Sequence, residues 1–142
     1  MSERVLMIWD YYDGPREGLA LYNGLPHYFK CIFDESIDEY SDVFELYPVG
    51  DEFLELAQEQ DEIFREWLNR YSKGLASRET HPGHRGVNPK FDELSDLLDS
   101  AIQRLKPLAN RYVPSFEALP DRAHPPPGIE PEPKASWVPV SQ

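Results

Sequence analysis

The chain has 142 residues, of which 40% are hydrophobic, and a formal net charge of −12 at pH 7. A chain of this length typically forms one domain and buries roughly two thirds of the surface that its unfolded form exposes. The negative charge disfavours nucleic acid as a direct ligand, because its phosphates would be repelled. A lone cysteine, Cys31, cannot form an internal disulfide, and no apolar run is long enough to span a bilayer. We therefore expect a cytoplasmic protein without a membrane segment.

Four strands are predicted in the first third of the chain. Residues 5–12 (VLMIWDYY) are apolar on both alternating faces, as in a central strand. Residues 19–23 and 27–34 follow, joined through Asn23-Gly24, a pair that tolerates the positive φ of a tight hairpin. Residues 43–48 complete a β-meander.

The stretch DYYDGPREG, from Asp10 to Gly18, separates the first two predicted strands. We interpret it as the first hairpin connection, in which Gly14 and Gly18 supply bends and Pro15 fixes φ.

Two helices are predicted next. Residues 52–72 carry apolar side chains at spacings of three and four, with acidic residues at the start and basic residues toward the end. Trp67 belongs to the apolar face and is expected to be buried against the sheet. A second helix is predicted to begin at Asn88-Pro89 and to end before Pro107.

The C-terminal part is of a different character. Residues 111–119 (RYVPSFEAL) suit an edge strand, the kind of strand that accepts Pro114. Residues 120–134 are rich in proline and are expected to be extended. Trp137 and two valines follow, and three alternatives remain open for this segment: docking on its own chain as a short strand, binding a partner, or disorder.

These elements predict an α+β fold: an antiparallel meander of about four strands, covered on one face by two helices, with a late edge strand and a Pro-rich tail. Residues 1–119 are predicted to be a single domain, and residues 120–142 its tail.

The net charge is confined to one segment. Residues 34–66 contain 13 acidic residues and one basic residue, Arg65, so this segment alone accounts for the −12 of the whole chain. Within it, five glutamates recur at spacings of three and four along one flank of the first helix. They are Glu52, Glu55, Glu59, Glu62 and Glu66, here called the acidic ridge. Such a ridge is either a solvated helix face or a docking surface for a basic partner.

Catalytic signatures are sparse. His81 and His84 lie three residues apart, but no second ligand pair accompanies them, so we expect replaceable loop residues, no metal and no cofactor. His27 and Cys31 share a strand face, where core packing is the simpler interpretation than a catalytic dyad. The best enzyme hypothesis is a polar pocket at the first hairpin, formed by Asp10, Tyr11, Tyr12, Asp13, Arg16 and Glu17.

The segments WDYYDGPREG, LPHYFKCIFDE and FREWLNRY, with the terminal WVPV, carry a resemblance. The chain resembles a family of small uncharacterised bacterial proteins that open with a Trp-Asp-Tyr, Asp-Gly-Pro pattern. The resemblance covers most of the chain and implies one intact unit that includes the terminal Trp; it implies no activity, cofactor or site residues.

For function we favour a non-enzymatic, acidic protein-binding module that neutralises a basic protein through the ridge. Immunity proteins, antitoxins and nucleic-acid mimics work in this way, and the analogy is drawn from size and charge. The alternative is a small enzyme that uses the pocket at residues 10–17. The sequence leaves the partner, any substrate and the oligomeric state open.

Overall fold

A computed structural model describes residues 1–119 and 132–140. The described chain forms two compact units. One, the barrel unit, comprises residues 1–49, 106–119 and 132–140. The other, the helical unit, comprises residues 50–105. Most of the predicted Pro-rich tail, residues 120–131, lies outside the described residues.

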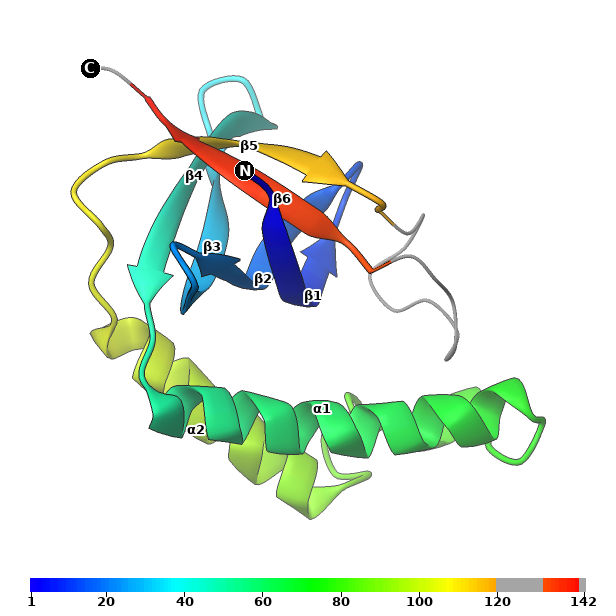
Figure 1. Cartoon of the computed structure of the whole chain (residues 1–142). Coiled ribbons are helices and arrows are strands. Elements are labelled where there is room, and N and C mark those ends of the chain that lie inside the picture. Colours follow the sequence, from blue (N-terminus) through cyan, green and yellow to red (C-terminus); the bar gives the residue numbers. More distant parts are fainter. Residues whose placement is uncertain (120–131, 141–142) are drawn as a thin grey trace. The chain divides into compact units, whose positions relative to one another are not determined.

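The barrel unit is a closed antiparallel sheet whose strands pair in chain order (Figure 1). Its strands are β1 (Glu3–Tyr11), β2 (Pro15–Tyr22), β3 (Leu25–Asp34), β4 (Glu39–Pro48), β5 (Tyr112–Glu117) and β6 (Lys134–Pro139). The α+β class and the meander of β1 to β4 agree with the sequence-based prediction. The predicted count of about four strands with a late edge strand is wrong, because the sheet has six strands and closes into a barrel.

The terminal segment around Trp137 closes the sheet. It forms β6, which pairs with β5 from Tyr112 to Glu117 and with β1 at Glu3 and Arg4. The late strand is therefore not an edge strand. Pro114 is tolerated there because β5 meets β4 at one pair only, Phe44 with Tyr112, and Pro114 lies beyond it.

Two tight turns confirm the predicted hairpins. Between β2 and β3, Asn23 and Gly24 both have positive φ, as a two-residue hairpin loop requires. Their backbone N–H groups donate to the Glu3 carboxylate at 2.9 and 2.7 Å. Between β1 and β2, Asp13 and Gly14 have positive φ, and the Tyr12 N–H donates to the Gly14 carbonyl.

Gly18 does not supply a bend. It lies inside β2, opposite Ile8, where a Cβ atom would stand 2.1 Å from the Met7 carbonyl oxygen. A glycine is required here because the neighbouring backbone approaches too closely for any side chain.

The barrel core is predominantly aromatic and aliphatic. Its buried cluster consists of Val5, Ile8, Ala20, Phe29, Cys31, Phe44, Leu46, Tyr112, Ala135 and Trp137. Val5 and Ile8 are three residues apart, which strict alternation would place on opposite faces. The shift in the β1–β2 register between Val5 and Met7 explains this, because a bulge rotates the side chains that follow it relative to those before it. The apolar residues on both faces of β1 therefore reflect an irregular strand.

The helical unit consists of α1 (Asp51–Ser72), a 3-10 turn η1 (Arg78–Thr80) and α2 (Pro89–Arg104). The predicted start of α2 is confirmed: Asn88 is its N-cap residue, and the Asn88 side chain accepts a hydrogen bond from the Phe91 N–H at 3.0 Å. The helices are linked by Gln60 of α1, whose amide donates to Ser95 Oγ at 2.6 Å. Among the described residues, no helix is long and apolar enough to cross a membrane. The covering of the sheet by these helices and the single domain over 1–119 stay predictions.

Replacing Gly18 with alanine should destabilise the barrel unit by about 3 kcal/mol, because the new methyl group must displace the backbone of β1. Gly50→Ala is the matched control, since no atom lies within 4 Å of a Cβ there and its φ is −87°. Urea denaturation followed by tryptophan fluorescence measures both. Equal midpoints for the two variants would contradict the close approach.

Candidate functional sites

All five glutamates of the acidic ridge are exposed on α1. Within residues 1–119 and 132–140, one ridge member forms an ion pair: Glu59 lies beside Lys90 of α2, with Nζ and Oε1 3.7 Å apart. Asp61, beside the ridge, pairs with Arg65 at 3.4 Å. The other four ridge carboxylates stand in solvent at spacings where like charges repel by a few tenths of a kcal/mol per pair.

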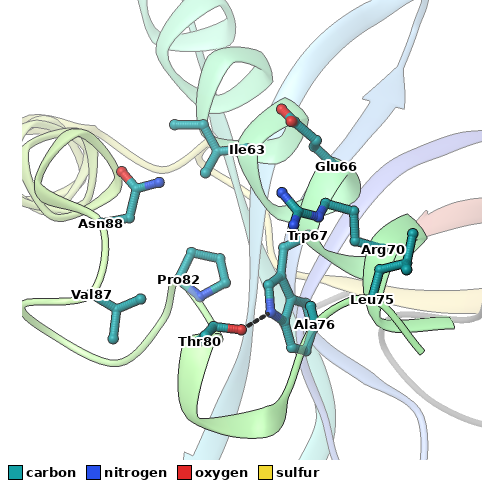
Figure 2. A pocket seen from close by; sticks show the side chains of 10 residues that line it. All are labelled: Ile63, Glu66, Trp67, Arg70, Leu75, Ala76, Thr80, Pro82, Val87 and Asn88. Atoms are coloured by element: carbon teal, nitrogen blue, oxygen red, sulfur yellow. Dashed lines mark hydrogen bonds between the residues drawn. The ribbon is translucent and has the colours of Figure 1, made fainter. Parts of the chain in front are cut away.

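A cavity of about 460 Å³ lies in the helical unit at the C-terminal end of the ridge (Figure 2). Here it is called the helix cavity. It is lined by Ile63, Glu66, Trp67, Arg70, Leu75, Ala76, Thr80, Pro82, Val87 and Asn88. Leu75 and Val87 are 65% and 42% exposed, so large apolar side chains face solvent at this cavity. Glu66 belongs both to the ridge and to the cavity wall, and sequence reasoning did not identify this junction.

Trp67 forms part of this cavity instead of the predicted buried core. Its side chain is only partly buried, whereas Phe64 on the same helix is 7% exposed. The indole N–H donates to Thr80 Oγ1 at 3.0 Å (Figure 2). The ring also stacks on that of Tyr71, with centroids 4.9 Å apart. The spacing of apolar residues identified the buried face of α1, which includes Phe64. It did not show that Trp67, at the edge of that face, stays accessible to solvent.

His81 packs against the aromatic rings of α1, so it is more than a replaceable loop residue. Its ring centroid lies 4.6 Å from that of Trp67 and 5.3 Å from that of Phe64. Nδ1 accepts from the Gly83 N–H at 2.8 Å, a bond that favours the neutral imidazole. Burial, followed by the charge of His84, lowers the pKa of His81.

The other pairs of potentially reactive residues do not form a site of their own. No group of three or more histidine, cysteine or acidic side chains suited to a metal occurs among residues 1–119 and 132–140. His27 bonds the Leu25 carbonyl at 2.9 Å, whereas the Cys31 thiol donates to the Ser41 carbonyl at 3.1 Å. Burial raises the pKa of Cys31, the opposite of what an activated thiolate requires.

A second cavity, of about 610 Å³, lies in the barrel unit beside the first hairpin. Here it is called the hairpin cavity. It is lined by Asp10, Tyr11, Tyr12, Asp13, Arg16, Phe33, Asp38, Glu39 and Tyr40. The sequence predicted the contribution of residues 10–16 and missed that of Phe33 and residues 38–40. The antiparallel pairing of β3 with β4 brings these to the same place, because Phe33 lies opposite Tyr40.

Arg16 organises one wall of the hairpin cavity. Its Nε donates to the Tyr12 carbonyl at 2.7 Å and its Nη2 to the Asp13 carbonyl at 3.2 Å, while its guanidinium lies 4.7 Å from the Tyr40 ring centroid. Tyr40 donates to Asp10 Oδ2 at 3.3 Å, and burial, together with the Asp10 charge, raises the Tyr40 pKa.

Glu17, predicted to join this pocket, is not part of its lining. Its carboxylate accepts a hydrogen bond from the Tyr28 hydroxyl. The strand alternation explains this, because neighbouring residues of β2 point to opposite faces and Arg16 takes the cavity side.

The chain matches no protein-family model, and neither curated proteins nor solved structures match it significantly. The resemblance to bacterial proteins with the Trp-Asp-Tyr pattern stays a prediction. The candidate sites must therefore be judged on their own geometry and charge.

Phe64→Ala should cost about 3–5 kcal/mol of unfolding free energy, the usual range for emptying a buried aromatic site. Trp67→Ala should cost only about 1–2 kcal/mol, because the indole is already partly solvated. Urea denaturation followed by circular dichroism compares the two. A Trp67 variant as unstable as the Phe64 variant would contradict the partial exposure described for Trp67.

The lowered pKa of His81 predicts a pH dependence of folding. Well above pH 6.5, the ordinary pKa of histidine, the imidazole is neutral in both states, and its contribution to stability is fully present. As the pH falls below this value the unfolded state binds the proton more readily, so stability decreases. His81→Phe keeps a ring but removes the titration, so its urea midpoint should fall less than that of the wild type between about pH 7.5 and 5.5. Parallel decreases in both proteins would overturn this assignment.

Proposed function

We propose that this protein is an acidic protein-binding module that neutralises a basic partner protein through the ridge of α1. The observation that carries the proposal is the position of Glu66, which ends the row of exposed glutamates and also lines the helix cavity. Negative charge and an accessible apolar surface thus adjoin one another on the same unit (Figure 2). A surface with both properties suits a partner that carries basic residues and an apolar anchor.

The cost of the ridge supports this proposal. A helix face needs charge for solubility, but alternating signs would serve that purpose and stabilise the helix, whereas five glutamates in succession repel one another. Among the five, only Glu59 forms an ion pair within the described part of the chain, with Lys90. Four unneutralised carboxylates remain over about 21 Å of helix, a length that matches an extended row of lysine or arginine side chains.

The chemistry of the partner follows from the same features. Basic side chains would lie along Glu52, Glu55 and Glu62, and an apolar side chain would enter the helix cavity between Trp67 and Val87. The apolar contact would supply affinity, because exposed carboxylates contribute mainly to the rate and the specificity of association. Nucleic acid remains disfavoured as the direct partner because of the charge.

The alternative is a small enzyme that uses the hairpin cavity. The observation in its favour is the cavity itself, whose lining includes five of the six residues that the enzyme hypothesis named: Asp10, Tyr11, Tyr12, Asp13 and Arg16. Against it, Arg16 is engaged by backbone carbonyls and Glu17 by Tyr28, so two of the expected polar groups have structural partners.

A triple variant, Glu52→Gln, Glu55→Gln and Glu62→Gln, tests the ridge while leaving the Glu59–Lys90 pair and the wall of the helix cavity intact. The partner is first isolated by affinity capture on the full chain, and its association rate is then measured at two salt concentrations. The variant should associate more slowly at about 0.01 M salt, where the Debye length is about 30 Å, and the difference should shrink near 0.15 M, where it is about 8 Å. Its stability should be unchanged or slightly higher, because repulsion is relieved.

The matched control is Glu35→Gln, Asp42→Asn and Asp99→Asn, three exposed acidic residues outside the ridge. This control removes the same amount of charge. If the ridge itself is the docking surface, the control should slow association less than the ridge variant does, or not at all. If both triple variants slow association equally, the net charge acts without a docking surface, and if neither does, the ridge is only a solvated face.

A further inference from the structure

The hairpin cavity combines aromatic surface with negative charge. Tyr12 and Phe33 are 70% and 43% exposed, although large aromatic rings are normally buried. Both rings surround Tyr40: Phe33 packs edge-on against it with centroids 5.1 Å apart, and Tyr12 lies 6.1 Å away at a tilt. The three rings form a partly open aromatic wall on one side of the cavity.

The charge of the lining selects the ligand. Asp10, Asp13, Asp38 and Glu39 contribute four carboxylates, against the single guanidinium of Arg16. Arg16 directs three of its nitrogens to the Tyr12 carbonyl, the Asp13 carbonyl and the Cys31 sulfur, so it belongs to the wall. An anion would be repelled by the remaining field, whereas a cation would be attracted.

The protein itself shows which cation suits this surface. The guanidinium of Arg16 covers the Tyr40 ring at 4.7 Å, a cation–π contact. A second planar guanidinium could stack on the accessible faces of Tyr12 and Phe33 and donate paired hydrogen bonds to the Asp38 or Glu39 carboxylate. A lysine ammonium could make neither the planar stack nor the forked pair. The cavity, of about 610 Å³, has room for the alkyl stem as well.

We propose that the hairpin cavity binds an arginine side chain presented by a partner polypeptide, with Tyr12 and Phe33 stacking on the guanidinium and Asp38 and Glu39 accepting its hydrogen bonds. This site lies in the barrel unit and does not rest on the ridge of α1. It extends the proposed binding of a basic protein, and either site could fail its test without the other.

The test uses the full chain and a capped Gly-Arg-Gly peptide, titrated while the aromatic and backbone NMR signals are recorded. Saturable shifts should centre on Tyr12, Phe33 and Tyr40. The matched control ligand is Gly-citrulline-Gly, which has the shape of the arginine peptide but no charge, and it should cause no saturable shift. Equal shifts from both peptides would overturn the proposal, as would shifts confined to α1.

Two variants locate the contacts. Phe33→Ala removes one exposed ring, and Asp38→Asn removes one charge at a position with φ of 54°, which asparagine accepts. Each should weaken arginine-peptide binding about fivefold or more, the effect of losing one partly desolvated cation contact. Glu35→Gln, an exposed residue outside the lining, should leave the affinity unchanged.

Free guanidinium ion and a capped Gly-Lys-Gly peptide complete the series. The proposal predicts that both bind more weakly than the arginine peptide, because one lacks the alkyl stem and the other the planar group. If free guanidinium binds as tightly as the peptide, the site takes a small cation instead of a polypeptide side chain, and the proposal is overturned. Wild-type affinity in the Phe33 and Asp38 variants, with the fold intact, would overturn it as well.

Discussion

The pairing of β6 with β1 closes the sheet, and the rest of the barrel unit depends on this closure. Without β6, strands β1 and β5 would expose unpaired N–H and C=O groups along open edges, which favour association with other chains. β6 also brings Trp137 into contact with Phe29, Phe44 and Phe116, with ring centroids 5.5–5.8 Å apart. The same short strand therefore pairs with the backbones of β1 and β5 and places the Trp137 ring in the core.

Closure also fixes the hairpin cavity. A barrel requires each strand to keep its register with two neighbours, so the ends of β1, β2, β3 and β4 cannot shift independently. The aromatic wall of Tyr12, Phe33 and Tyr40 draws on two hairpins that are far apart in sequence but belong to one closed sheet. A binding surface formed in this way is held in place before any ligand arrives, which lowers the entropic cost of binding.

Local signals in the sequence predicted local structure well. Asn23-Gly24 and Asn88-Pro89 act through the conformation of single residues, so their turn and helix start could be read without knowledge of the fold. Gly18 could not be read in this way, because its requirement comes from the carbonyl of Met7 on a neighbouring strand. Pairing of Lys134 and Ala135 with Arg4 and Glu3 brings together segments from opposite ends of the sequence, and neither segment carries a signal for its partner.

The same distinction applies to the candidate sites: features formed by neighbouring residues were predictable, and contacts between distant segments were not. The ridge follows from helical spacing alone, and its glutamates are exposed as a regular helix face permits. Five of the nine residues that line the hairpin cavity lie within residues 10–16 and were predicted together, whereas Phe33 and Tyr40 reach the cavity through strand pairing. The helix cavity went unrecognised because periodicity places Trp67 on the apolar face but does not reveal that the loop carrying Thr80 and His81 packs on it.

The chain leaves the barrel after β4, forms the helical unit and returns to the barrel at the neighbouring strand, β5. β4 ends at Pro48 and β5 begins at Tyr112, and the Leu108 N–H donates to the Leu46 carbonyl at 2.7 Å, so the two connections meet on the barrel. The helices are thus an insertion into a hairpin, and a chain without residues 50–105 would retain the same order of strands. Such an arrangement is modular: the segment between β4 and β5 could be lengthened, recharged or exchanged without changing the order in which the strands of the barrel pair.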